Sequence, residues 1–287
     1  MDFISVLTEG NGLVAAELRP PRATLDPRAG MEAWIDTYHA VEGLARLGTY
    51  SFLTDGAVGE QEEHNLRHLI ANLGDDVPRK HIVPFLTTKH TLNYCLRYAD
   101  RAWETGFRSL VVLGGDTTVG LPRVVPHGAD LRQLIRTRQP QLTLGGWANP
   151  HGDIDDQVDF LLKNNVTADF FLTQVVSHHD RIAVETFVAA AHRRQLTLPG
   201  VFGVFFYRSA SIDTFKFLAR FLPIPAAHLT AEFEAGLTAI QICARSIAML
   251  RQLGVNNIYV SNLPVGSAAP TLKAILFEAE QMTGRIL

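Results

Sequence analysis

The chain has 287 residues, of which 47% are hydrophobic and 19% are charged, and its formal net charge is −3. This composition is typical of a globular protein with a large core and excludes a disordered or fibrous chain. No block of Lys and Arg provides an electrostatic footprint for nucleic acid, and no apolar run approaches the roughly 18 residues of a membrane span. We therefore expect neither a nucleic-acid partner nor a membrane protein.

The first residues, MDFISVLTEGNG, contain neither a basic segment nor a long apolar core, so no secretory signal peptide is expected. Cys95 and Cys243 lie far apart and match no CxxC pattern of a metal or redox site. We interpret them as free, buried thiols in a reducing compartment. The sequence thus predicts a cytoplasmic protein.

Eight short apolar segments have the length and composition of buried strands. The central example is SLVVLGG at 109–115, where four consecutive apolar residues precede two glycines and then Asp116. Such a run is too short for an ordinary helix and is typical of a strand that is buried on both faces. The predicted strands are 13–18, 50–54, 81–86, 109–114, 141–147, 168–174, 200–206 and 256–261.

Segments with apolar residues at three- and four-residue spacing separate these strands and predict amphipathic helices. In 30–47, for example, Trp34, Tyr38, Val41 and Leu44 fall on one face. The predicted helices are 30–47, 61–73, 91–104, 130–138, 154–165, 180–195, 212–221, 231–253 and 268–282.

Strict alternation of strands and helices implies a parallel sheet, and eight repeats favour an α/β fold of the single-domain (β/α)8 TIM-barrel type over residues 1–287. The alternative is an open α/β sheet. That fold would need a GxGxxG turn or a P-loop to bind a nucleotide in the usual way, and the chain has neither.

In a barrel, the carboxyl ends of all strands open into one mouth, where active sites lie. The residues that this rule places there are mainly carboxylates, amides and aromatic rings, which suit a flat heteroaromatic ligand with hydrogen-bonding edges. They are Glu17, Thr54, Asp55, Thr87, Asp116, Trp147, Asn149, His151, Gln174, Tyr207, Arg208 and Asn262. Each has an ordinary structural explanation on its own, so their convergence carries the prediction.

Four motifs, taken in order along the chain, resemble the methylenetetrahydrofolate reductase family. They are AELRPP at 16–21, LGGD at 113–116, GWANPHGD at 146–153 and LTQ at 172–174. The resemblance covers the whole chain and is specific in the order of the motifs more than in any one of them. It implies an oxidoreductase of one-carbon metabolism and methionine biosynthesis, which reduces 5,10-methylenetetrahydrofolate to 5-methyltetrahydrofolate with NAD(P)H through bound FAD.

The resemblance also implies roles for individual residues. Glu17 matches the general acid that helps to open the five-membered ring of the substrate, and Asp116 matches a second catalytic carboxylate, which lies beside the flavin and binds the pterin. Gln174 and Tyr207 are expected on the substrate, as an amide contact and a stacking ring. The expected cofactor-binding residues are Thr54, Asp116, Trp147, His151 and Lys163.

These residue types fit the reaction. A carboxylate pairs bidentately with the two parallel donors of the pterin edge, and its charge stabilises the cationic iminium that forms before hydride arrives. Ring opening needs a protonated acid near neutral pH, so we expect a raised pKa for Glu17 in a poorly solvated mouth. The amide of Gln174 can donate and accept at once.

Several positions differ from the family pattern around the FAD diphosphate. An arginine two residues before the matched aspartate is replaced by Gly114, and an asparagine and an arginine of a later helix fall on Asp159 and Leu162. Losing these groups weakens a diphosphate site. Two alternatives therefore remain: a flavin-independent reductase with direct hydride transfer, and a non-catalytic folate-binding barrel subunit. Retention of Glu17 argues against the second, and a homo-oligomer is left open.

Histidines raise the question of a metal, and none is expected. His64 and His68 are four residues apart, but HNLRH lacks the Glu of HExxH, so a solvated helix face is the preferred interpretation. His178 and His179 follow the sixth strand, where one of them is a candidate ligand contact, and Asp180 is expected to cap the next helix. A metal-dependent barrel hydrolase would need a ligand set at the strand ends, where only His151 is found.

Overall fold

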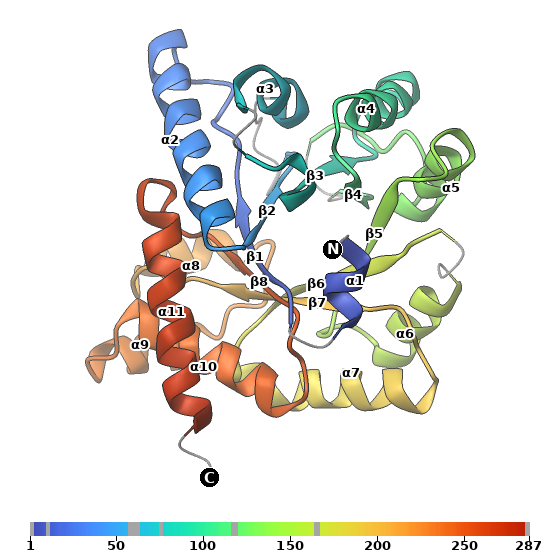
Figure 1. Ribbon diagram of the computed structural model, residues 1–287. Coiled ribbons are helices and arrows are strands. Elements are labelled where there is room, and N and C mark those ends of the chain that lie inside the picture. The colour runs from blue at the N-terminus through green and yellow to red at the C-terminus, as the bar shows by residue number, and fades with distance from the viewer. Residues whose placement is uncertain are drawn as a thin grey trace.

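The protein is described by a computed structural model, which covers residues 3–9, 12–56, 64–74, 77–115, 120–163 and 167–284. Within these residues, eight parallel strands form a closed barrel in chain order, β1 pairing with both β2 and β8. Helices surround the strands, as Figure 1 shows. The predicted single-domain (β/α)8 barrel is confirmed.

Each predicted strand is present, with bounds within two residues of those expected. The strands are β1 (Val14–Leu18), β2 (Tyr50–Leu53), β3 (Ile82–Thr87), β4 (Ser109–Leu113), β5 (Thr143–Ala148), β6 (Phe170–Val176), β7 (Gly200–Phe205) and β8 (Ile258–Ser261). The α-helices are α1 (Phe3–Thr8), α2 (Pro27–Arg46), α3 (Asn65–Asn72), α4 (Leu92–Glu104), α5 (Gly128–Arg138), α6 (Ile154–Lys163), α7 (Arg181–Arg193), α8 (Ile212–Leu218), α9 (Ala226–Glu234), α10 (Ala239–Gln252) and α11 (Ala268–Thr283). Short 3-10 turns are η2 (Arg79–His81), η4 (His178–Asp180) and η5 (Val265–Ser267).

One predicted helix is in fact two. The apolar periodicity of 231–253 runs across a break between α9 and α10, where Gly236 has a φ of 87°. Glycine adopts this left-handed conformation without a steric penalty, and it ends α9. Thr238 then begins α10 with a capping box, in which its hydroxyl accepts from the Gln241 amide. The parts of the predicted helices 61–73 and 154–165 that lie at 61–63 and 164–165 fall outside the described residues.

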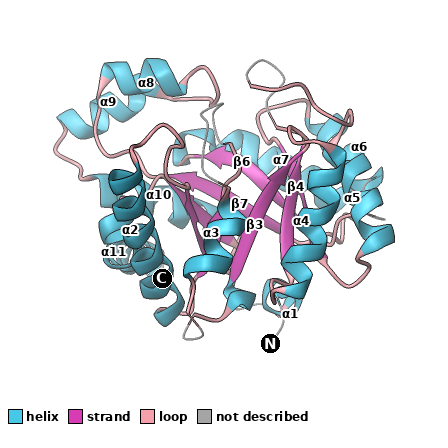
Figure 2. Cartoon of the chain, turned by 90° about the horizontal axis from the view of Figure 1, so that it is seen from above, coloured by secondary structure: helices cyan, strands magenta, loops and turns pink. Residues whose placement is uncertain are grey.

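The helix α1, which was not predicted, closes the N-terminal end of the barrel. Its Phe3 ring lies 5.2 Å from the ring of Tyr50 and 4.8 Å from that of Phe170, both inside the barrel. Figure 2 places α1 and the α8–α9 segment at opposite ends of the strands. The end of the barrel that carries the carboxyl ends of the strands is therefore separate from the end that α1 fills.

The core has two layers, because alternate residues of a strand face opposite sides. On β2, Phe52 belongs to the cluster inside the barrel, whereas Leu53 packs with the helices outside. Glycines make room for the largest interior rings: a Cβ at Gly145 would lie 2.7 Å from Cε2 of Phe170.

Cys95 and Cys243 are free and buried, as expected, and burial raises the pKa of Cys95 to about 12. Among the described helices, none combines the length and apolar character needed to cross a membrane.

Asn65, the first residue of α3, holds this helix on the barrel. Its Nδ2 donates to the carbonyls of Leu53 at 3.2 Å, Thr54 at 2.9 Å and Phe85 at 3.0 Å, and its Oδ1 accepts from the Tyr98 hydroxyl at 2.8 Å. The Asn65 side chain is buried, so these hydrogen bonds form without competition from solvent, and the Tyr98 hydroxyl also donates to the Phe85 carbonyl at 3.1 Å.

We expect Asn65→Ala to lower the free energy of unfolding by about 2–3 kcal/mol, because it removes several buried hydrogen bonds at once. Urea unfolding followed by circular dichroism measures the change. Asn72→Ala is the matched control on the same helix, since Asn72 is exposed and donates only locally, to the His68 carbonyl. Its effect should stay within about 0.5 kcal/mol. Equal losses in the two variants would contradict the assigned role of Asn65.

Candidate active site at the barrel mouth

Glu17 lies at the mouth, as predicted. It is half-buried between the fully buried Ala16 and Leu18, which face the outer helices, so its own side chain belongs to the inner face of β1. Ser261 is its register partner on β8, and the Ser261 hydroxyl donates to Glu17 Oε1 at 2.6 Å. The charge of Glu17 also reaches Tyr259, whose pKa is held well above its ordinary value by burial first and by Glu17 second. The carboxylate therefore faces the barrel interior with one oxygen held in place.

A carboxylate and an imidazole pair at the ends of β2 and β3. Asp55 Oδ2 accepts from the Thr87 amide at 2.7 Å and from its hydroxyl at 3.0 Å, and His90 Nε2 lies 2.9 Å from each Asp55 oxygen. The His90 ring lies 4.5 Å from that of Tyr94, whose pKa is raised to about 12 by burial and by Asp55. Sequence reasoning placed Asp55 and Thr87 at the mouth but missed His90, although its place three residues after β3 was an available signal.

The segment after β4 brings an arginine to the mouth. Asp116 itself lies outside the described residues, so its predicted role stays a prediction. The guanidinium of Arg123 fills the space beside Gly114, where a Cβ would lie 2.8 Å from Arg123 Cζ. Arg123 donates from Nε to the Gly115 carbonyl at 3.2 Å and from Nη1 to the Pro126 carbonyl at 3.1 Å. The guanidinium of a later loop residue thus lies directly beside Gly114.

The loop after β5 is held firmly. Trp147 is half-buried against the interior cluster at the end of β5. Two residues after Trp147, Asn149 Oδ1 accepts from the His151 amide at 3.1 Å. His151 Nε2 lies 3.0 Å from the carbonyl of Val175 on β6. The structure therefore brings Trp147 and His151 to the mouth, as predicted, and uses one nitrogen of His151 to join two neighbouring strand ends.

Gln174 lies in a bulge of β6, where the pairing with β7 shifts between Leu172 and Val175. Its Oε1 accepts from the Val175 amide at 2.9 Å, so the side-chain carbonyl is already engaged and the amide NH2 is the part left to contact a ligand. Thr54 is buried directly after β2, and its backbone bonds to Leu18 and Asn65. These hydrogen bonds fix the backbone at the carboxyl end of β2.

Tyr207 is covered rather than open. Only 6% of it is exposed, and its ring meets the Phe215 ring of α8 edge-on at 5.9 Å and the Phe205 ring at 4.9 Å. Burial is also the main cause of its raised pKa. The expectation of a ring free to stack on substrate is not met in this arrangement, because α8, from the insertion between β7 and β8, packs over it.

Lys163 does not reach the mouth. It is the last residue of α6, and helices of a (β/α)8 barrel run antiparallel to the strands, so the end of α6 lies about 13 Å along its axis from the mouth side. One turn earlier, Asp159 forms an ion pair with Arg194 at the end of α7. The direction of α6 thus places Lys163 away from Trp147, and its role as a cofactor contact stays a prediction.

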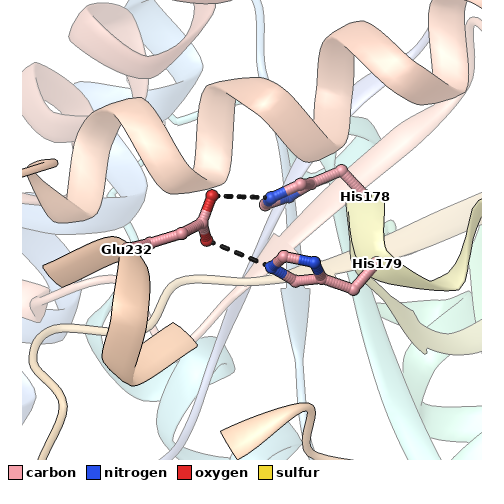
Figure 3. A group of neighbouring side chains, drawn as sticks. All are labelled: His178, His179 and Glu232. Atoms are coloured by element: carbon pink, nitrogen blue, oxygen red, sulfur yellow. Dashed lines mark hydrogen bonds and ion pairs between the residues drawn. The ribbon is translucent and has the colours of Figure 1, made fainter. Parts of the chain in front are cut away.

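Two histidines at the end of β6 meet a glutamate of α9, as Figure 3 shows. Nε2 of His178 lies 2.9 Å from Glu232 Oε1, and Nε2 of His179 lies 3.1 Å from Oε2. Burial lowers the pKa of His178. Burial alone would raise the pKa of Glu232, but His178, His179 and Arg245 bring it below its ordinary value. Glu232 lies 54 residues from His178, and nothing in the local sequence indicated this contact.

Of two smaller expectations about histidine-rich segments, one is corrected and the other holds in part. The carboxylate of Asp180 does not cap α7: it accepts from the Ser177 amide and hydroxyl, each at 2.8 Å, and closes the η4 turn instead. His64 is exposed, in keeping with the solvated face expected there, whereas His68 is half-buried. His64 Nδ1 lies 3.1 Å from the Tyr94 hydroxyl, while His68 stacks on Trp34 at 4.4 Å.

Searches against family models and against curated proteins find no match for this chain. Solved structures do match. An uncharacterized Clostridium thermocellum protein that binds two copies of 5-methyl-5,6,7,8-tetrahydrofolic acid has a TM-score of 0.65 at 16% identity, over 98% of this chain and 99% of the other. A 2,3-dimethylmalate lyase of the PEP mutase/isocitrate lyase superfamily has a TM-score of 0.51 at 12% identity, over 99% and 85%. A protein of Aquifex aeolicus VF5 has a TM-score of 0.52 at 10% identity, over 98% of each chain. At these identities the likeness shows the barrel fold.

Proposed function

We propose that this chain binds a reduced folate in the mouth of its barrel and reduces 5,10-methylenetetrahydrofolate to 5-methyltetrahydrofolate with NAD(P)H. The observation that carries the proposal is Glu17, a half-buried carboxylate at the mouth, held by Ser261. The full-length structural likeness to a protein that binds 5-methyltetrahydrofolate supports a folate as the ligand. Trp147 offers an aromatic surface for the pterin.

The proposed reaction has two steps that this mouth can serve. Protonated Glu17 gives its proton to the ring nitrogen that leaves when the five-membered ring opens, and the other nitrogen then holds the methylene carbon as a cationic iminium. Hydride from the nicotinamide adds to that carbon and makes the methyl group, while NAD(P)H becomes NAD(P)+. Glu17, now a carboxylate, stabilises the cation until hydride arrives and recovers its proton from water.

Two features of the described residues argue against FAD as the cofactor. Lys163 lies at the far end of α6, and Asp159, which takes the place of a family residue at the diphosphate, is paired with Arg194. Hydride is therefore proposed to pass directly from NAD(P)H to the folate. Arg123, beside Gly114, offers the guanidinium for an anionic part of either ligand, such as the folate glutamate or a dinucleotide phosphate.

The purified protein should be colourless, stay so after FAD is added and passed through a desalting column, and oxidise NADH or NADPH only when methylenetetrahydrofolate is present. Absorption spectra and product analysis for 5-methyltetrahydrofolate test this.

Trp147→Ala should weaken 5-methyltetrahydrofolate binding about tenfold through lost stacking. Phe277→Ala, at an exposed ring of α11, is the control and should leave binding unchanged.

The other outcomes separate the alternatives. Stoichiometric flavin on the protein would overturn direct transfer and favour the two-step relay. Folate binding without NAD(P)H oxidation would leave a non-catalytic folate-binding barrel. Failure to bind any reduced folate at high micromolar concentration would remove the proposed function altogether.

A further inference from the structure

The cluster of His178, His179 and Glu232 follows the carboxyl end of β6 and shares no residue with the proposed folate site. Its donor atoms come from two separate parts of the chain, the η4 turn and α9. Within the residues that the structure describes, this cluster brings two imidazole nitrogens and a carboxylate oxygen within 4.8 Å of one another. Imidazole and carboxylate are the ligands that zinc and neighbouring divalent metals take in proteins.

The spacing of these atoms can be brought to that of a metal shell by side-chain rotation. Tetrahedral Zn²⁺ with bonds of about 2.0–2.1 Å holds its ligand atoms about 3.3 Å apart. His179 Nε2 already lies 3.1 Å from Glu232 Oε2, and the ligand atoms of all three residues lie within 4.8 Å of one another. His178 Nε2 lies 2.9 Å from Oε1, so its ring must turn from Oε1 toward Oε2 to complete the shell.

Further contacts hold the three side chains in position. His178 Nδ1 lies 3.1 Å from the Ser246 hydroxyl, which orients the ring so that Nε2 faces Glu232. Arg245 donates to Glu232 Oε1 at 2.7 Å, and the His179 ring stacks on that of His228 at 4.9 Å. Hydrogen bonds of this kind, made to the outer atoms of ligands, are the usual support of a metal site.

We propose that His178, His179 and Glu232 bind one Zn²⁺ ion, which joins α9 to the end of β6. Glu232 Oε2 is the ligand atom, because Oε1 stays with Arg245. Three protein ligands leave a fourth position for water or a small anionic ligand. The ion would hold in place the α8–α9 segment, which also covers Tyr207. The zinc proposal does not depend on the folate proposal, so that either can fail without the other.

The test is zinc binding by the full chain after treatment with a chelator and its removal. Isothermal titration with ZnCl2 should show one equivalent bound, and the tetrahedral Co²⁺ form should show visible d–d absorption. His179→Ala should weaken binding at least a hundredfold and abolish the Co²⁺ bands. His192→Ala, at an exposed histidine of α7, is the matched control and should bind like the wild type.

Thermal unfolding distinguishes the loss of the zinc site from misfolding of the variant. The melting temperature of the wild type should rise with added Zn²⁺, whereas that of a folded His179→Ala variant should stay unchanged by Zn²⁺. A wild type that binds no zinc would overturn the proposal. So would a His179→Ala variant that binds zinc as tightly as the wild type, because the metal would then lie elsewhere. Folate binding is measured in the same samples and reports on the other proposal separately.

Discussion

Replacing Glu17 by glutamine should lower turnover of methylenetetrahydrofolate by about 10²–10⁴-fold, the usual contribution of a positioned general acid. Glutamine has nearly the same shape and can still accept from the Ser261 hydroxyl, which lies 2.6 Å from Glu17 Oε1. It has no acidic proton, so the ring of the substrate stays closed. Affinity for 5-methyltetrahydrofolate should therefore change little. NAD(P)H oxidation measures the first effect, and calorimetric titration with 5-methyltetrahydrofolate measures the second.

Glu42→Gln is the control for this prediction. Glu42 is a carboxylate on α2 that pairs with Arg46 outside the barrel, and its replacement should leave both turnover and folate binding unchanged. Unaltered turnover in Glu17→Gln would remove the acid role. A loss of folate affinity as large as the loss of turnover would make Glu17 a binding residue that acts equally before and during the reaction.

The barrel was predictable because its strands carry their signal locally. In β4, Leu110, Val111 and Val112 are fully buried, and an unbroken apolar run is what a strand covered on both faces requires. The helix 231–253 was predicted as one element because apolar spacing alone does not reveal a turn at Gly236. The φ of 87° at that glycine is a property of the folded backbone, not of the hydrophobic pattern.

Residues of the candidate site could be predicted only where the strand topology alone determines their position. Glu17, Trp147 and His151 lie at the mouth because a parallel barrel puts all its strand ends together. The direction of α6 carries Lys163 away from that mouth, which a motif match on a helix does not take into account, so its role as a cofactor contact stays a prediction. Glu232 could not be found, since its contacts with His178 depend on how the α8–α9 insertion folds back on β6.

Gly203 and Tyr259 show how the barrel interior limits substitution. A Cβ at Gly203 would overlap the Tyr259 hydroxyl and ring, lying 2.8 Å from Cε1. The ring has little freedom to retreat, because Tyr259 is fully buried and its hydroxyl donates to the Thr173 carbonyl at 2.6 Å. We expect Gly203→Ala to lower the free energy of unfolding by about 3 kcal/mol, from overpacking together with strain on that hydrogen bond. Urea unfolding measures the change.

Gly30→Ala is the control and should change the free energy of unfolding in the opposite direction. Gly30 lies inside α2, and no neighbouring atom lies within 4 Å of the position of its Cβ, so alanine adds helix propensity without a clash. Its free energy of unfolding should rise by about 0.5–1 kcal/mol. If Gly203→Ala also left the protein as stable as the wild type, Tyr259 would have to move freely inside a closed barrel. Its hydrogen bond to the Thr173 carbonyl would then contribute nothing to stability.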